Sequence, residues 1–192
     1  GAPGGVVSAV RVGLLGGSFD PVHYGHLRAA QWSLEAFGLD EVRLIPARQS
    51  PFKGPCAASG EDRRAMLSLA VEGNSALVVE GCELEREAPS YTVDTLRMLT
   101  ARLPQCRFTL ILGSDAAAGL DRWQESAEVR RLAEIRVLGR PGDEATNPGV
   151  APFEGLSISS TGIRDAVKSS RSIRYLTPES VRLYIEEKGL YK

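Results

Sequence analysis

The residues of this chain most suited to chemistry are its only two histidines, His23 and His26, which stand three positions apart. They follow the glycine-rich stretch GGSFDPV at 16–22 and enclose Gly25. Side chains three apart at a helix start point to the same side, and glycines let a backbone approach a phosphate closely. The spacing therefore predicts two imidazoles that face a bound phosphate.

Two other interpretations of the histidine pair stay open at this point. Both rings could be packing residues held by hydrogen bonds, although nothing in helix packing requires glycines at 16, 17 and 25. Histidines at this spacing could also share a metal ion. The chain has no third histidine, however, and no cysteine lies nearby in sequence.

The surrounding segments indicate how the pair is positioned. Short runs rich in β-branched residues alternate with longer segments of helical periodicity, a pattern typical of βαβ units in a parallel sheet. We expect a doubly wound, Rossmann-like α/β fold with helices on both faces and a small C-terminal helical part over 159–192. All of 1–192 is expected to form one domain, with residues 1–5 disordered or a remnant of cloning.

The expected strands cover 6–15, 42–45, 76–79, 108–112 and 135–138. The expected helices cover 25–37, 60 to about 72 with Ser59 and Asp62 as a reciprocal capping box, a stretch after 89–92, and two C-terminal stretches that start at 159–161 and 177–179. Residues 139–152 are rich in turn formers and are expected to be a flexible loop. The glycine-rich stretch and residues 113–115 then lie at strand-to-helix junctions, where open α/β sheets bind anions.

Composition narrows the function classes. With 192 residues, 43% hydrophobic and 24% charged, and a formal net charge of −1, the chain is not expected to carry a broad nucleic-acid-binding face. No apolar run approaches the ~20 residues of a membrane span, so we expect a cytoplasmic protein without a membrane partner. Cys56, Cys82 and Cys106 are odd in number and are expected to be reduced thiols. Whether the chain forms a homo-oligomer is left open.

The sequence resembles the nicotinate-nucleotide adenylyltransferases, a family of nucleotidyltransferases with an H-x-G-H signature. The likeness covers nearly the whole chain and rests on segments 16–27, 89–96, 111–115, 123, 140–142, 158–164 and 172–176. It implies an enzyme of NAD biosynthesis that uses ATP with Mg²⁺ to convert nicotinate mononucleotide into nicotinate adenine dinucleotide and pyrophosphate. The chain departs from the family at Phe52, where histidine is usual, and at Ala166, where a basic residue is frequent.

Such a transfer needs N–H donors and positive charge around a triphosphate rather than an acid, base or covalent nucleophile, because the attacking phosphate is already an anion. The catalytic candidates are His23, His26, Lys53 and Arg164. The expected ATP-binding residues are Gly16, Gly17, Ser18, Phe19, His23, His26, Gly113, Asp115, Ser159, Ser160, Thr161 and Arg164. The expected nicotinate-nucleotide-binding residues are Ser18, Lys53, Ser90, Tyr91, Thr92 and Trp123. Mg²⁺ is expected to arrive with the ATP phosphates, without dedicated protein ligands.

Several of these candidates have plainer structural interpretations. Lys53 could be a solvated loop lysine, Trp123 a core aromatic residue and Asp115 a helix cap. The stretch 159–161 with Arg164 could be an ordinary helix N-cap followed by a surface arginine.

Three other functions compete with the one that the resemblance implies. A nicotinamide-dependent dehydrogenase is disfavoured because residues 13–17 lack the G-x-G-x-x-G spacing and residues 45–48 hold no acidic residue for a ribose hydroxyl. A related adenylyl- or cytidylyltransferase for nicotinamide mononucleotide or phosphopantetheine is the nearer rival, and the segment 89–96 with Trp123 disfavours a phosphopantetheine or cytidylyl substrate. A nucleotide sensor without turnover is the third, against which the presence of both histidines, Lys53 and Arg164 argues.

Overall fold

The computed structural model describes residues 8–49, 54–87, 89–139, 142–143 and 149–192. Six strands form one sheet in the order β3-β2-β1-β4-β5-β6, and every pair of neighbours is parallel. The strands are β1 (Val10–Gly17), β2 (Glu41–Pro46), β3 (Leu77–Val79), β4 (Cys106–Gly113), β5 (Ala133–Gly139) and β6 (Val150–Pro152). The expected doubly wound α/β fold is therefore confirmed.

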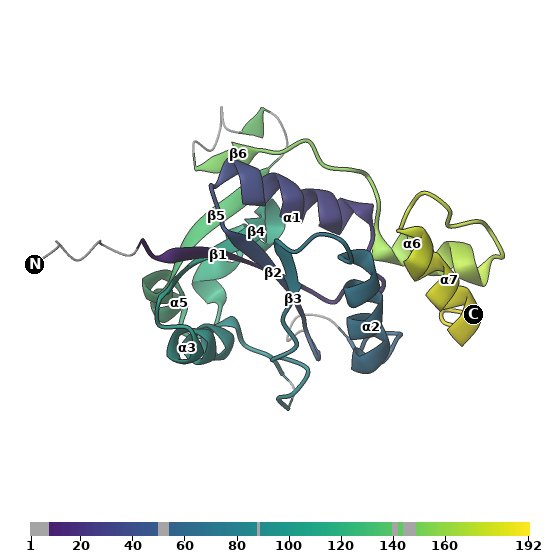
Figure 1. Ribbon diagram of the computed structural model, residues 1–192, viewed down its shortest axis with the longest axis horizontal. Helices are drawn as coiled ribbons and strands as arrows, with labels where there is room; N and C mark the ends of the chain where they lie inside the picture. Colours follow the sequence, from purple (N-terminus) through teal and green to yellow (C-terminus); the bar gives the residue numbers. More distant parts are fainter. Residues whose placement is uncertain (1–7, 50–53, 88, 140–141, 144–148) are drawn as a thin grey trace, which may run out of the picture.

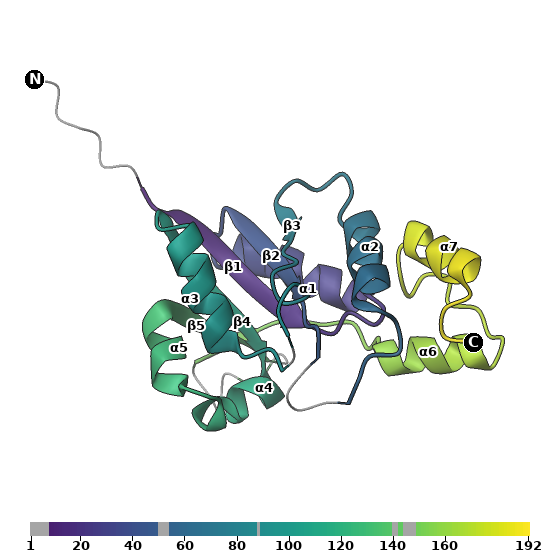
Figure 2. The same ribbon diagram turned by 90° about the horizontal axis from the view of Figure 1, so that it is seen from below.

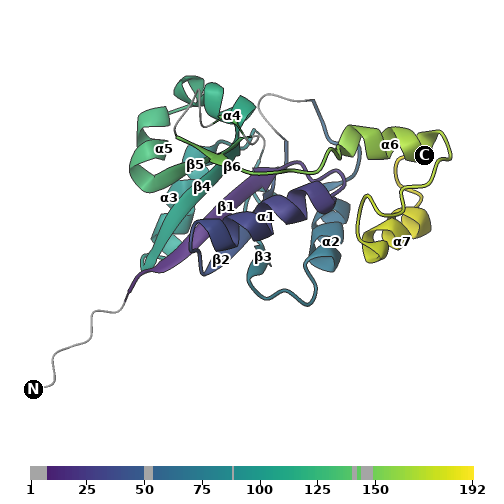
Figure 3. The ribbon, with the colours of Figure 1, turned by 90° about the horizontal axis from the view of Figure 1, so that it is seen from above.

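Helices cover both faces of this sheet (Figure 1). They are α1 (Tyr24–Ala36), α2 (Gly60–Ala70), α3 (Thr92–Arg102), α4 (Ser114–Ala118), the short 3₁₀ turn η1 (Leu120–Arg122), α5 (Ser126–Leu132), α6 (Ser160–Lys168) and α7 (Glu179–Lys188). Helix α1 lies across the face seen from above in Figure 3, whereas α3 and α5 lie on the face seen from below in Figure 2. The sheet is thus covered on both sides, as parallel sheets require.

The alternation of side chains along the strands produces two apolar layers. Val12 and Leu14 of β1 are buried in the layer beneath α3 and α5. Gly13, between them, faces the opposite layer, where a Cβ atom would come within 2.6 Å of Leu39 Cδ1 and 3.0 Å of Ile111 Cδ1. The lack of a side chain at Gly13 therefore lets the layer on the α1 side pack closely onto the central strand.

The strand order places a crevice beside the end of β1. From β1 the chain passes through α1 to β2 on one side, and it later returns through α3 to β4 on the other side of β1. In open α/β sheets, ligands bind at the carboxyl ends of the strands where the strand order reverses in this way. Here those ends carry Gly16 and Gly17 on β1 and Gly113 on β4.

The last two helices lie beyond the end of the sheet, close to the segment that follows β1 (Figure 1). Ile163 of α6 and Val181 of α7 are buried in the same apolar layer as α1 and α2. The Tyr184 hydroxyl of α7 donates a hydrogen bond of 2.6 Å to Asp62 of α2, and the Tyr191 hydroxyl donates one of 2.7 Å to Asp20. The C-terminal helical part is thus packed onto the segment that bears the histidines.

Several expected boundaries are corrected. Strand β1 includes Gly16 and Gly17, which were expected to lie in a turn after it, because both pair with β2. Strand β6 lies within the expected loop over 139–152. The start of α4 at Ser114 confirms the strand-to-helix junction expected at 113–115. Helix α5 and the turn η1 were not predicted, because segments of seven and three residues show too little periodicity to be recognised.

Two predicted helix caps are also corrected. Ser59 caps α2 by accepting a 3.0 Å hydrogen bond from the Asp62 N–H, but the reciprocal half of the box is missing because the Asp62 carboxylate accepts from Tyr184. Thr177 does not cap α7, whose N-cap position is Pro178. The Thr177 hydroxyl donates instead to the Val22 carbonyl at 2.7 Å.

Two further findings concern the whole described chain. Cys56, Cys82 and Cys106 are free thiols, as expected. Over the ranges that the structure describes, no helix combines the length and apolar character that a membrane crossing would need.

We expect Tyr191→Phe to lower the free energy of unfolding by about 1 to 3 kcal/mol, because it removes one charge-assisted hydrogen bond from the buried Asp20 carboxylate. Urea denaturation measures this loss. Tyr184→Phe is the matched control and should cost less, because water can replace its hydroxyl at the more exposed Asp62. Equal losses in the two variants would contradict the importance given to Asp20.

Candidate active site

The turn over residues 18–22, between β1 and α1, has most of its carbonyl groups bonded to side chains from distant parts of the chain. A buried carbonyl needs a donor, and a short turn cannot supply its own. The donors come from α2, from α6 and from the residue before Pro178. The hydrogen bonds run from Arg63 to Ser18 O (2.8 Å), Arg164 to Asp20 O (2.8 Å), Ser160 to Pro21 O (2.8 Å) and Thr177 to Val22 O (2.7 Å).

The Asp20 side chain is the second anchor of this turn, and it is only 4% exposed. Its carboxylate accepts hydrogen bonds from the N–H groups of Ala57 (2.7 Å) and Ala58 (3.0 Å) and from the Tyr191 hydroxyl (2.7 Å). Arg164 lies 4.0 Å away. Burial and the bond to Asp20 raise the pKa of Tyr191 well above its usual value, so the hydroxyl keeps its proton. Asp20 was given no role from sequence, because none of its partners is near it in the chain.

The side chains of the two histidines cap α1 by accepting hydrogen bonds from backbone N–H groups at the start of the helix. The His23 Nδ1 atom accepts from the Gly25 N–H at 3.0 Å, and the His26 Nδ1 atom accepts from the His23 N–H at 3.1 Å. The rings stack with their centroids 3.7 Å apart. The Phe19 ring meets His26 edge-on at 4.8 Å, from a residue whose φ of 49° lies in the left-handed region. The interpretation of the pair as residues held by hydrogen bonds is therefore correct for one atom of each ring, Nδ1, which accepts a structural hydrogen bond.

These bonds determine which nitrogen carries the proton. An imidazole that accepts at Nδ1 must, when neutral, hold its hydrogen on Nε2. Burial lowers the pKa of His23 to about 4, so this ring is neutral at pH 7. Each Nε2–H group is then a donor, and a phosphate oxygen is a suitable acceptor. The same two rings can thus cap a helix and bind an anion.

The glycines at positions 16, 25 and 113 differ in whether the surrounding protein leaves room for a side chain. At Gly25 a Cβ atom would lie 2.7 Å from His23 Cε1 and 2.9 Å from His23 Nδ1, so the ring position requires glycine there. At Gly16 a Cβ would meet only the Ile45 carbonyl oxygen, at 3.9 Å, and at Gly113 it would meet nothing within 4 Å. The protein itself leaves open space in front of Gly16 and Gly113, at the crevice where a nucleotide is expected.

The start of α6 is brought against the histidine turn. Ser159 is the N-cap and accepts from the Gly162 N–H at 3.0 Å, as the plainer interpretation expected. Arg164 is more than a surface arginine, because it donates to the Asp20 carbonyl and to the Thr161 hydroxyl (3.3 Å) and is 30% exposed. The chain thus joins a helix N-terminus and a guanidinium to the histidines across about 140 positions.

The expected acceptor residues lie at the start of α3. Tyr91 holds the N-cap position without a side-chain cap bond, Thr92 is the first helical residue, and Ser90 is buried. The Ser90 N–H donates to the Gln49 carbonyl at 3.4 Å, which ties this start to the segment after β2. Trp123 is partly buried against the apolar layer of α3 and α5, so its core interpretation is correct for part of the ring.

The remaining candidates are placed as follows. Asp115 is exposed in the first turn of α4, where Gly113 is the N-cap residue, so Asp115 is not the helix cap. Lys53 and Phe52 lie outside the described residues. Ala166 is 6% exposed and packs in the apolar layer beneath α6, so this position faces the core and not a phosphate. Within the described part of the chain, no group of three or more His, Cys, Asp or Glu side chains could hold a metal ion.

Comparisons with known proteins agree with this architecture. A family model described as cytidylyltransferase-like matches residues 14–166, which places the chain in that class of nucleotidyltransferases. A curated relative from Geobacillus kaustophilus is 44% identical over 185 residues, covering 94% of this chain and 86% of its own. One from Roseiflexus sp. is 42% identical over 200 residues, covering 97% of this chain and 100% of its own. Both are named "Probable nicotinate-nucleotide adenylyltransferase".

Solved structures show the same fold. The Plasmodium falciparum nicotinic acid mononucleotide adenylyltransferase complexed with NaAD superposes with a TM-score of 0.78 at 20% identity, covering 94% of this chain and 97% of that one. With relatives above 40% identity along nearly its whole length, the chain belongs to the nicotinate-nucleotide adenylyltransferase family.

The lowered pKa of His23 predicts a stability that depends on pH. Between pH 6.5 and about 4 the unfolded chain binds a proton that the folded His23 does not, so the free energy of unfolding falls as the pH drops through this window. His23 should account for up to about 3 kcal/mol of that loss. His23→Asn keeps an oxygen for the Gly25 N–H but cannot titrate, and it should lose correspondingly less.

Urea denaturation of both proteins at about pH 7 and about pH 4.5 makes the comparison. Other carboxyl groups titrate equally in the two proteins and cancel. If the variant loses as much stability as the unchanged protein, His23 is not held neutral by burial.

Proposed function

We propose that this protein transfers the adenylyl group of ATP, bound with Mg²⁺, to nicotinate mononucleotide, producing nicotinate adenine dinucleotide and pyrophosphate in NAD biosynthesis. The observation that carries the proposal is the meeting of His23, His26 and the start of α6 at the turn after β1. Family membership supports it, because the relatives named above carry the name of this activity.

The chemistry is a direct in-line substitution. An oxygen of the acceptor 5′-phosphate forms a bond to the α-phosphorus of ATP, and the bond from that phosphorus to the bridging oxygen of the β-phosphate breaks, so that pyrophosphate leaves. Because the nucleophile is already an anion, no side chain has to remove a proton from it. The protein contributes alignment and donors for the charge that develops on the phosphates.

The donors come from the residues assembled at the turn. His23 and His26 would offer Nε2–H groups to the phosphates next to the reacting bond, without the cost of holding an imidazolium in a buried place. Ser159 to Thr161, at the N-terminus of α6, and Arg164 would bind the departing pyrophosphate. Lys53, on the loop after β2, would add a cation between the two substrates. Mg²⁺ enters as part of the ATP substrate, with the phosphates as its ligands.

The acceptor site would form at the start of α3. Helix α3 (Thr92–Arg102) begins with N–H groups that, together with Ser90 and Tyr91, would suit the carboxylate of a nicotinate ring. Trp123 would stack on that ring through the part of its side chain that remains exposed. Gly113 and Asp115, at the end of β4, would face the ATP side of the crevice.

Measurement of pyrophosphate release with MgATP and each of three acceptors tests the proposal. We expect nicotinate mononucleotide to support turnover better than nicotinamide mononucleotide, and phosphopantetheine to support none. If none of the three acceptors supports pyrophosphate release, the protein is not a transferase of this kind. Preference for phosphopantetheine would assign the related transferase activity instead, and binding of ATP without release would indicate a nucleotide sensor.

Two substitutions separate the roles of the donors and the acceptor pocket. His23→Ala should lower kcat by about 100- to 1000-fold with little change in the acceptor KM, the scale of one lost preorganised donor. Trp123→Ala should mainly raise the acceptor KM, by about tenfold, through the lost stacking contact. Trp32→Ala, on α1 away from the crevice, is the matched control and should change neither constant beyond about twofold in folded protein. The reverse pattern would overturn both assignments.

A further inference from the structure

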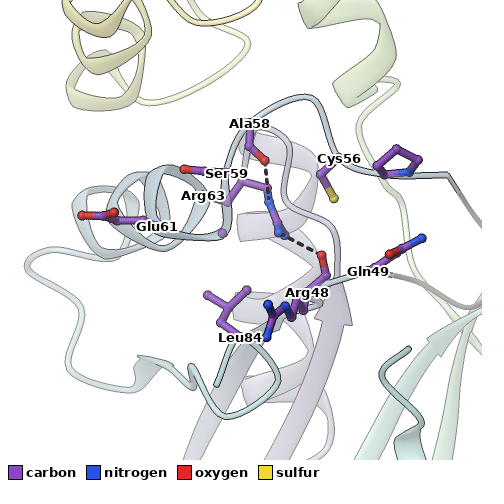
Figure 4. A pocket seen from close by; sticks show the side chains of 10 residues that line it. Arg48, Gln49, Cys56, Ala58, Ser59, Glu61, Arg63 and Leu84 are labelled. Atoms are coloured by element: carbon purple, nitrogen blue, oxygen red, sulfur yellow. Dashed lines mark hydrogen bonds between the residues drawn. The ribbon is translucent and has the colours of Figure 1, made fainter. Parts of the chain in front are cut away.

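Arg63, on the first turn of α2, is the most buried charged side chain of the described residues, with 1% of its surface exposed. Its guanidinium donates only to backbone carbonyl groups, two of which are drawn in Figure 4. The four hydrogen bonds reach Ser18 O (2.8 Å), Ala47 O (2.6 Å), Arg48 O (3.3 Å) and Ala58 O (3.3 Å). Arg63 therefore connects three separate segments of the chain.

Such a residue is expensive to bury. A guanidinium stays charged in proteins, and burying a charge costs several kcal/mol unless its partners compensate. Among the residues that the structure describes, the hydrogen bonds of Arg63 go to backbone carbonyl groups and not to a carboxylate. A long apolar side chain could fill the same space, but it would leave the Ser18 and Ala47 carbonyls without this donor and would not fix the three segments relative to one another. The arrangement therefore suggests that Arg63 provides geometry rather than stability alone.

Each of the three segments that Arg63 binds leads to a part of the candidate site. Ser18 begins the turn that leads to the histidines. Ala47 and Arg48 follow β2 and precede, in the sequence, the acceptor candidate Lys53, which lies outside the described residues. Ala58 holds the Asp20 carboxylate through its own N–H group at 3.0 Å. One planar fork thus sets the distance between the segment that would contact ATP and the segment that leads to the acceptor.

A pocket lies beside Arg63, between α2 and the segment that follows β2. It has a volume of about 440 Å³ and is lined by Arg48, Gln49 and Cys56 as well as Arg63 (Figure 4). Gln49 also accepts from the Ser90 N–H, so the segment after β2 links Arg63 to the start of α3. A shift of this segment would move the acceptor residues relative to the histidine turn.

We propose that Arg63 is a positioning residue that aligns the two substrates for in-line transfer. The proposal rests on the proposed function, because it concerns how the two half-sites of that reaction are held. Arg63 touches neither substrate and acts through the carbonyls of Ser18, Ala47 and Arg48. Its loss should leave each substrate able to bind alone but badly aligned with the other, and a misplacement of about 1 Å can cost about 100-fold in rate.

The test compares Arg63→Lys and Arg63→Met with the unchanged protein. Lysine keeps the charge but lacks the planar fork, and methionine keeps the length without charge. Arg43→Met is the matched control. Arg43 lies on β2 and its side chain is only 20% exposed, but it forms ion pairs with Glu41 and Glu80 and does not bind the carbonyl groups that Arg63 binds. All assays are run at a temperature at which circular dichroism shows each protein to be folded.

We expect kcat for pyrophosphate release to fall about 100-fold in both Arg63 variants, while the Kd of ATP alone and the KM of nicotinate mononucleotide change less than about threefold. Arg43→Met should keep kcat within about twofold. Wild-type kcat in a folded Arg63→Met protein would overturn the proposal, and so would a loss confined to KM. If neither Arg63 variant folds, Arg63 serves stability and the proposal is wrong.

Amide hydrogen exchange provides a readout that does not depend on turnover. Exchange should rise in Arg63→Lys at residues 17–20 and also at 47–49, and not in Arg43→Met. If the unchanged protein is inactive with every acceptor, the proposed function fails, and hydrogen exchange alone then decides the positioning role. A rise at both segments supports that role, and an unchanged pattern overturns it.

Discussion

The carbonyl groups of the turn over residues 18–22 impose the main constraint on this protein. They are turned into the structure, where each needs a donor that a five-residue turn cannot provide. Arg63, Ser160, Arg164 and Thr177 provide the donors for four of them, from positions 45 to 155 residues away. Three of these four donors, Ser160, Arg164 and Thr177, come from the C-terminal part of the chain, which packs beside the turn.

The electrostatics of the site follow from the same turn. Asp20 is buried as a carboxylate because two N–H groups and the Tyr191 hydroxyl bind it. His23 is buried as a neutral ring because its Nδ1 atom is used in capping α1 and desolvation lowers its pKa to about 4. In the proposed function, a phosphate would thus meet oriented N–H donors and the guanidinium of Arg164. Donors held in place before binding need no reorganisation when charge develops.

The sheet supplies the second half of the arrangement. The connections from β1 and from β4 lead to opposite sides of the sheet, and open α/β sheets bind ligands at the carboxyl ends of two such neighbouring strands. Gly16 and Gly113 stand at these ends, where added Cβ atoms would meet almost nothing. Gly25 is different, since the His23 ring itself requires it. Gly25 is thus needed for packing within the protein, whereas packing within the protein does not require glycine at Gly16 or Gly113.

Sequence alone determined the features that depend on neighbours within a few positions: the parallel α/β class from its periodicity, the caps at Ser59 and Ser159, and the histidine pair around Gly25. Tertiary structure alone decided which donor each distant group receives. Asp62 and Thr177 read as helix caps, yet they bind Tyr184 and Val22, and Arg63 showed no signal at all. Local propensity describes how a residue acts on its own turn of chain. It holds no information on which carbonyl, a hundred residues away, will be buried beside it and lack a partner.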